Sequence, residues 1–386
     1  MVEILNGKIL KISGRIDSNN AFELEKELFS AAEGCKDNIT IDVSDTSYIS
    51  SAGLRVFLKL KKMTSGEVSV INASPEIYDI FDVTGFTSLI NVSKRLREIN
   101  VEGCEIIGQG GNGTVYRIDD DKIVKVYRPV IGLAQIDKER EFAKTALING
   151  VPCVIAYDVV KCGDSYGIVF EMLKSDTLGH AMKNNPEKLD EYVDKYVALA
   201  YELHSTKIKD GAFTNIKTVL HERVTNLAKW CSPEEMQLLD SLIDELPDGN
   251  TLIHGDFHPG NIMIQDGELV LIDMPEVTVG AKIWDLAGIY RDMISAPQTT
   301  PEAVETSVGM PKELIMDVGY RFFRKYTGMN DEELEAYFKQ IGLVYALNVV
   351  LIVGAGSKRA VSRAEAVMDR KVVIPNEQAL RHILRS

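Results

Sequence analysis

The stretch from Leu252 to Pro275 places polar side chains at the ends of two apolar runs. Asp256 and Asn261 follow the first run, and Asp273 follows the second. A carboxylate such as Asp256 can accept the proton of an attacking hydroxyl group. The oxygens of Asn261 and Asp273 are ligands that suit Mg²⁺ beside phosphate groups. These residue types and this spacing predict a phosphoryl-transfer site, with Asp256 as the base and Asn261 and Asp273 as metal ligands.

A lone Asp-x-x-x-x-Asn is common in loops, but here it stands within HGDFHPGN, which begins at His254. This motif resembles the signature of the aminoglycoside phosphotransferase and choline kinase group, the small-molecule branch of the protein kinase-like fold. Gly255 stands where protein kinases have Arg before the catalytic Asp. The resemblance implies ATP and Mg²⁺ as cofactors and a hydroxyl-bearing small molecule as the acceptor. It also implies that His254 supports the structure of the loop.

A second short motif, WDLA, begins at Trp284 and resembles the D-L-A-type helix start of the same family. We expect the carboxylate of Asp285 to bond the backbone of the catalytic loop, as helix-capping carboxylates can. The alternative is a plain helix cap that makes no contact with the loop.

A glycine-rich segment earlier in the chain contains Gly108, Gly110 and Gly113. The pattern G-x-G-x-x-G alone would equally suggest a dinucleotide site, in which a helix follows the loop. Here two strand-like runs follow instead, Val115–Ile118 and Ile123–Tyr127. A glycine loop between strands is the kinase arrangement, in which backbone N–H groups cover the phosphates. We therefore assign the three glycines to nucleotide binding.

Lys125 lies in the second of these runs and fits the lysine that contacts the α- and β-phosphates. Such a lysine needs an acidic partner on the next helix, which we expect at 137–147. Alignment of the E-R-E run with the aminoglycoside phosphotransferases favours Glu141, which we predict as the partner. Helical phase favours Glu139, because it shares a face with the apolar residues of that helix.

An apolar strand that begins at Tyr166 leads into a polar segment after Leu173. It resembles the last strand and the hinge of a nucleotide-binding lobe. We expect backbone groups of Glu171 and Leu173 to hydrogen-bond adenine.

Residues 1–98 read as short strands alternating with helices, which predicts a partly parallel α/β sheet. The stretch Ile41–Leu54 resembles the STAS fold of anti-sigma factor antagonists, and the position of that family's phosphoacceptor is Ser51. The usual Asp before it is replaced by Ser50, and Ala52 follows. Either serine can cap the next helix. A phosphoacceptor or partner-docking role for Ser51 is the alternative.

Three parts are predicted for this chain of 386 residues. Residues 1–98 form a STAS-like regulatory domain of α/β class. Residues 102–174 form the nucleotide lobe of an α+β, bilobal, protein kinase-like domain. Residues 175–386 form its helical lobe, which holds the catalytic loop and the acceptor region.

The composition of the chain argues against some classes of partner and favours one cellular location. The net charge of −14 argues against a general nucleic-acid partner. The five cysteines show no C-x-x-C spacing, which favours a reducing, cytoplasmic location. No unbroken apolar run of about 18 residues occurs, so no membrane span is predicted. The longest such run, Ile341–Gly354, is interrupted by Asn348 and is expected to be a buried helix.

The sequence thus predicts an ATP- and Mg²⁺-dependent phosphotransferase acting on a small-molecule hydroxyl. Its STAS-like domain is expected to regulate the enzyme or to dock a protein partner. One alternative is a non-catalytic nucleotide-binding protein that presents the STAS surface to a partner. Another is a protein kinase acting on a STAS serine, against which Gly255 and the lack of an A-P-E motif after Asp273 count.

Overall fold

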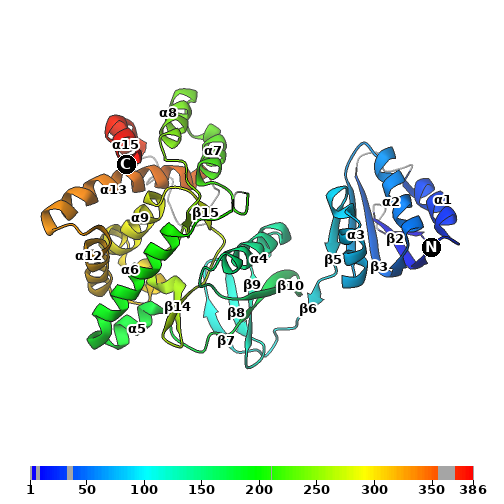
Figure 1. The fold of residues 1–386 in the computed structure, drawn as a ribbon, viewed down its shortest axis with the longest axis horizontal. Helices are drawn as coiled ribbons and strands as arrows, with labels where there is room; N and C mark the ends of the chain where they lie inside the picture. Colours follow the sequence, from blue (N-terminus) through cyan, green and yellow to red (C-terminus); the bar gives the residue numbers. More distant parts are fainter. Residues whose placement is uncertain (1, 6–8, 33–37, 210, 355–369, 386) are drawn as a thin grey trace. The chain divides into compact units, whose positions relative to one another are not determined.

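The computed structural model describes residues 2–5, 9–32, 38–209, 211–354 and 370–385. The chain forms two compact units, Met1–Ile99 and Asn100–Ser386 (Figure 1).

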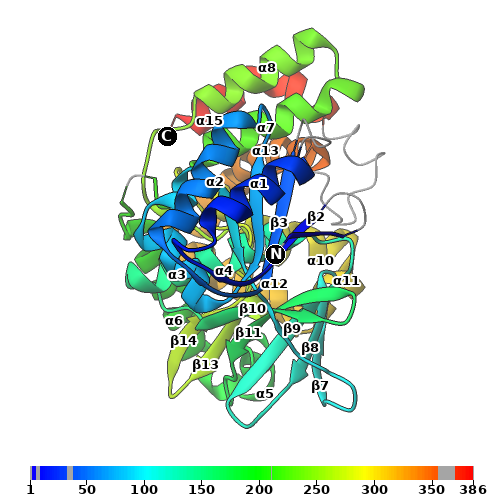
Figure 2. The same ribbon diagram turned by 90° about the vertical axis from the view of Figure 1, so that its right-hand side faces the viewer.

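The first unit is a five-stranded sheet in the order β1-β2-β3-β4-β5, in which β1 and β2 are antiparallel and the other neighbours are parallel. Its strands are β1 (Val2–Leu5), β2 (Ile9–Ile16), β3 (Ile39–Ile49), β4 (Val68–Ala73) and β5 (Asn91–Lys94), and the short β6 (Arg97–Glu98) follows. Its helices, which cover the sheet in Figure 2, are α1 (Ala21–Ala32), α2 (Ser51–Met63) and α3 (Pro75–Val83).

The core of this unit follows from the alternation of side chains along its strands. Ile39, Ile41 and Val43 of β3 are all buried, because every second residue of a strand points to the same face. Leu54 and Phe57 of α2 are buried as well, one helical turn apart. The predicted α/β class of the N-terminal domain is confirmed.

The second unit begins with an antiparallel sheet in which β10, β11, β9, β8 and β7 are neighbours in that order. The strands are β7 (Ile106–Gln109), β8 (Gly113–Arg117), β9 (Lys122–Tyr127), β10 (Ala156–Cys162) and β11 (Ser165–Glu171). A single long helix, α4 (Leu133–Ile148), packs against β10 and β11 (Figure 1).

The rest of this unit is mainly helical, which confirms the predicted bilobal α+β fold. Two small strand pairs carry the catalytic stretch, β12 (Leu252–Ile253) with β15 (Thr278–Val279) and β13 (Ile262–Gln265) with β14 (Glu268–Leu271). The helices are α5 (Leu178–Asn184), α6 (Leu189–Ser205), α7 (Ile216–Asn226), α8 (Pro233–Asp244), α9 (Ile283–Tyr290), α10 (Ala296–Thr299), α11 (Pro301–Val308), α12 (Lys312–Thr327), α13 (Asp331–Gly354) and α15 (Glu377–Leu384).

Among the described residues, α13 is the one helix long and apolar enough to cross a membrane. It packs against α7 and α9, and 56% of its most apolar stretch is buried within the protein. This burial agrees with the expectation that the apolar run ending at Gly354 is a core helix.

Candidate active site

The predicted nucleotide-binding residues meet at one cavity of about 390 Å³ in the second unit. This volume lies within the range of about 300–1,000 Å³ that is usual for small-molecule sites. The predicted residues in its wall are Gly108, Gly110, Gly113, Lys125, Glu171, Leu173, Asn261 and Asp273. They come from the glycine loop between β7 and β8, from β9, from the end of β11, and from the two ends of the β13–β14 hairpin.

Lys125 joins the two sides of this cavity. Its Nζ lies 2.9 Å from Glu139 Oε1 and 2.8 Å from Asp273 Oδ1. The prediction that Glu141 is the partner is therefore wrong. Glu139 lies on the inward face of α4, in line with the buried Ala143, whereas Glu141 is half exposed and pairs with Arg140. Helical phase was the better guide, because it decides which carboxylate points into the lobe.

The two carboxylates determine the charge state of Lys125. Burial alone would lower the pKa of this lysine, but Asp273 and Glu139 outweigh burial and hold it well above its ordinary value. Burial also raises the pKa of Glu139. The ammonium group is thus kept charged although the side chain is largely buried, as a phosphate-binding lysine requires.

Asp273 adopts an uncommon backbone conformation, with φ at 63°. For a residue other than glycine this left-handed conformation costs about 1–3 kcal/mol, and such strain is concentrated at functional sites. The neighbouring residue restrains it, since Ile272 N donates to Asn261 O at 3.0 Å. This bond fixes the two predicted metal ligands relative to each other.

Asp256 and Asn261 are connected directly. The amide nitrogen of Asn261 donates to Asp256 O at 3.0 Å and to Asp256 Oδ2 at 3.1 Å. Because the nitrogen of Asn261 is used in this way, its Oδ1 is the atom of this side chain that could bind a metal. With the Asp273 carboxylate it would provide two oxygen ligands. This set suits Mg²⁺, which commonly takes one or two protein ligands and completes its shell with phosphate oxygens and water.

Arg291 is a residue of the site that the sequence analysis did not identify. It begins a π-helical turn, Arg291–Ser295, directly after α9. Its Nη2 donates to Asp256 Oδ1 at 3.0 Å, and its guanidinium also bonds the carboxylate of Asp292. Burial opposes the charge of Arg291, but Asp292 and Asp256 raise its pKa nonetheless. Arg291 therefore fixes the orientation of the Asp256 carboxylate.

The backbone of the catalytic loop is held by Asp285. Its Oδ2 accepts from His254 N at 2.8 Å, and its Oδ1 accepts from Gly255 N at 2.7 Å, so the expected contact is present. The same carboxylate lies 3.2 Å from His204 Nε2, and Tyr326 OH lies 2.8 Å from His204 Nδ1. A continuous buried chain of bonds thus connects α12 to the loop.

His254 itself points into the protein interior. Its Nδ1 accepts from Asp256 N at 3.3 Å, and burial lowers its pKa, which favours the neutral imidazole. Gly255 beside it has φ of 82°, and a Cβ atom there would lie 2.8 Å from Glu276 O. The position therefore requires glycine, which is a steric reason for the absence of the protein-kinase Arg.

Few backbone N–H groups of the hinge are available to bind adenine. Glu171 N donates to Ile155 O, Met172 N donates to Asp121 O, and Lys174 N donates to Gln265 Oε1. In the part of the chain that the structure describes, Leu173 is the residue of this segment whose N–H is not used. Of the two predicted adenine-binding positions, Leu173 therefore offers the donor.

In the first unit, the two serines have different positions at the start of α2. Ser50 is the N-cap, and its Oγ accepts from Gly53 N at 3.4 Å. Ser51 is the first residue of the helix and is exposed. The capping role therefore belongs to Ser50, and the hydroxyl of Ser51 is accessible.

Comparison with known proteins gives independent information on both units. Residues 1–99 match the STAS domain, and residues 103–308 match the phosphotransferase enzyme family. A putative anti-sigma factor antagonist, BtrV of Bordetella bronchiseptica, is 33% identical over 85 residues, which are 21% of this chain and 73% of that protein. The anti-sigma-B factor antagonist of Bacillus subtilis is 34% identical over 89 residues, which are 22% of this chain and 81% of that protein.

Solved structures that resemble the chain include the streptomycin–ATP–APH(2")-IIa ternary complex. It is 14% identical with a TM-score of 0.45, and the match covers 80% of this chain and 99% of that one. A choline/ethanolamine kinase family protein from Mesorhizobium loti is 15% identical with a TM-score of 0.43, covering 73% and 92% of the two chains. Since the family model spans more than half of the residues, the chain belongs to the phosphotransferase enzyme family, and it carries a STAS domain at residues 1–99.

Proposed function

We propose that the protein transfers the γ-phosphate of ATP to a hydroxyl group of a small molecule in a Mg²⁺-dependent reaction. The observation that carries this proposal is the pair of contacts that Lys125 makes, to Glu139 and to Asp273, at the wall of the glycine-loop cavity. They bring a charged lysine and a metal-binding carboxylate to one place where a triphosphate can bind. The match to the phosphotransferase family supports the same class of reaction.

Each residue of the site has its own role in the proposed reaction. Backbone N–H groups of the glycine loop cover the phosphates, and Lys125 neutralises the charge on the α- and β-phosphates. Asn261 and Asp273 would hold Mg²⁺, which, when bound, neutralises charge on the β- and γ-phosphate oxygens. Leu173 N–H is the donor for adenine at the hinge.

Asp256 accepts the proton of the acceptor hydroxyl group. The acceptor oxygen forms a bond to the γ-phosphorus while the bond from that phosphorus to the leaving ADP oxygen breaks, and the hydroxyl proton passes to Asp256. Arg291 and Asn261 hold one carboxylate oxygen each. Catalysis then comes mainly from positioning and charge neutralisation, because little covalent chemistry is left to the protein.

We further propose that the STAS domain regulates the phosphotransferase or docks a protein partner. The similarity to anti-sigma factor antagonists supports a protein-binding role. A protein kinase that phosphorylates its own Ser51 is the second candidate, because this hydroxyl is exposed at the start of α2.

Calorimetry with ATP, with and without Mg²⁺, tests the first part of the proposal. We expect metal-dependent nucleotide binding that Asp273→Ala weakens. We also expect Asp256→Asn to bind ATP as the unchanged protein does but to lose about 10²–10⁴ in transfer rate. Nucleotide binding without any dependence on Mg²⁺ or Asp273, or full turnover by Asp256→Asn, would disprove these assignments.

A further inference from the structure

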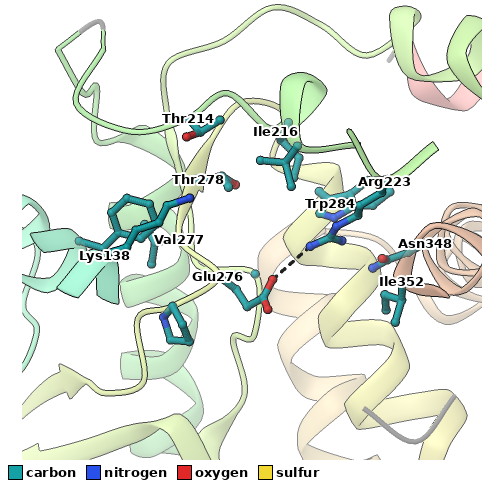
Figure 3. Close-up of a pocket in the computed structure, with 14 residues that line it drawn as sticks. Lys138, Thr214, Ile216, Arg223, Glu276, Val277, Thr278, Trp284, Asn348 and Ile352 are labelled. Atoms are coloured by element: carbon teal, nitrogen blue, oxygen red, sulfur yellow. Dashed lines mark hydrogen bonds and ion pairs between the residues drawn. The ribbon is translucent and has the colours of Figure 1, made fainter. Parts of the chain in front are cut away.

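A second pocket, of about 100 Å³, lies in the second unit, where α4 of the nucleotide lobe meets the helical lobe (Figure 3). It is enclosed by side chains from α4, α7 and α13 and by the segment Pro275–Thr278. None of the residues that line it lines the nucleotide cavity. It lies beside the catalytic stretch all the same, since Gly255 forms part of its wall and directly precedes Asp256.

Two buried polar side chains in this pocket each have an oxygen atom that lacks a hydrogen-bond partner among the described residues. Asn348 is 6% exposed and Thr278 is 7% exposed. Within the described part of the chain, Asn348 Oδ1 and Thr278 Oγ1 have no partner. Buried polar groups in native proteins are normally paired, so each exception needs a reason, and a ligand that supplies the missing bonds is one. Asn348 also lies beyond residues 103–308, the part that matches the family.

The charged residues of the pocket limit what can bind. Arg223 Nη2 lies 3.2 Å from Glu276 Oε2, and Lys138 from α4 adds a second cation. The ion pair occupies one nitrogen of a group that has five N–H donors. Two cations and one carboxylate give the lining a formal charge of +1, in a chain whose net charge is −14. A polycationic ligand such as an aminoglycoside is therefore disfavoured here.

The directions of the side chains agree with a polar ligand. In Figure 3, Asn348 points from α13 toward the Arg223–Glu276 pair, while Thr278 and Lys138 lie toward the other end of the pocket. An acceptor oxygen and a guanidinium thus converge at one end, and a hydroxyl and an ammonium group are available at the other.

We propose that this pocket binds a small hydroxylated carboxylate, of the hydroxy-acid or sugar-acid class, as the phosphoryl acceptor. The acceptor role rests on the function proposed above. The ligand's hydroxyl groups donate to Asn348 Oδ1 and Thr278 Oγ1, and its carboxylate binds donors of Arg223 other than the one that bonds Glu276. An engineered cavity of about 150 Å³ holds benzene, so a pocket of this size takes a part of at most about six non-hydrogen atoms.

The test measures binding of three matched probes and one longer acid to the full chain in the presence of Mg²⁺ and ADP. Glycerate, glycerol and serinol share a three-carbon skeleton but carry a negative, zero and positive charge; threonate extends the acid by one carbon. Binding is measured by ligand-observed NMR, which does not depend on turnover. We expect one of the two acids to bind at least tenfold more tightly than glycerol and serinol.

Two near-isosteric variants then locate the binding. Asn348→Leu and Thr278→Val should weaken acid binding at least tenfold while leaving Tm unchanged or raised, because they remove unpaired buried polar atoms. Thr46→Val is the matched control. Thr46 is also buried, but its Oγ1 donates to Ile12 O at 3.0 Å, so this variant should lower Tm and leave acid binding unchanged.

The outcomes separate the two proposals. Failure of both acids to bind while Mg²⁺-dependent ATP binding persists would overturn the pocket assignment and leave the phosphotransferase proposal standing. Acid binding that neither Asn348→Leu nor Thr278→Val weakens, or tighter binding of serinol, would overturn the assignment as well. Loss of ATP binding in the unchanged protein would overturn both.

Discussion

Arg291 Nη2 lies 3.0 Å from Asp256 Oδ1, so the proposed catalytic base is held by a cation that comes 35 positions later in the chain. Both side chains are largely buried, and Asp292 shares the same guanidinium. The base is thus oriented from outside its own loop.

We predict that Arg291→Gln lowers kcat on the order of 10²-fold, because a small misplacement of a catalytic group has effects of that size. KM for ATP should change little, since Arg291 does not line the nucleotide cavity. Steady-state kinetics measure both values. Arg321→Gln is the control, because Arg321 also pairs with two carboxylates but lies at the surface. An equal loss of kcat in both variants would contradict an orienting role for Arg291.

A second prediction concerns the partner of Lys125. Glu139→Gln should weaken binding of Mg²⁺–ATP about 10- to 100-fold, because it removes a charge-assisted hydrogen bond in a buried site. Glu141→Gln, two residues along the same helix, should bind ATP as the unchanged protein does. Calorimetry on the pair decides between the two carboxylates, and a larger effect in Glu141→Gln would reverse the assignment.

A third prediction concerns the STAS domain. We expect no stoichiometric label on Ser51 when the full chain is incubated with γ-labelled ATP. The Asp that precedes the phosphoacceptor in the STAS family is replaced by Ser50, whose side chain caps α2. Phosphosite mapping by mass spectrometry gives the answer. Label on Ser51 that disappears in Asp256→Asn would favour self-phosphorylation over docking.

The last prediction is a pH dependence of stability at the C-terminal end. Hydrogen bonds from Arg385 and Arg381 lower the pKa of Glu245 to about 2. Its contribution to stability is therefore fully present above the unfolded-state pKa of about 4.3 and is lost as the pH falls toward 2. Between pH 6 and pH 3, Tm should fall less in Glu245→Gln than in the unchanged protein. Glu222→Gln, at an exposed position of α7, should follow the unchanged protein.

Local sequence predicted the residues of the nucleotide site because its motifs are short and each is carried by one loop or strand. Gly108, Lys125, Asn261 and Asp273 were found in this way, and they meet at one cavity. The prediction of Glu141 was wrong because it followed the alignment of the E-R-E run. Helical phase, which places Glu139 on the inward face of α4, was given less weight.

Long-range contacts could not be predicted from one sequence. Arg291 reaches the loop residue Asp256 from the π-helical turn after α9, and no spacing rule joins the two positions. The sequence shows that Asn348 interrupts an apolar run. It does not show that Asn348 lines a pocket together with Thr278, which lies 70 positions earlier. Asn348 lies on α13 and Thr278 begins β15, and the tertiary fold places both in the wall of one pocket.

The bonds from Asp285 to the amides of His254 and Gly255 have a consequence for how the molecule opens. Amide protons exchange with solvent only when their bonds break, and the units that break together are cooperative. Because Asp285 is bonded in turn to His204 of α6, which meets Tyr326 of α12, these two amides should not be released by movement of the loop alone. Their slow exchange would report that the catalytic loop stays bound to α9, which the same carboxylate links to α6 and, through His204, to α12.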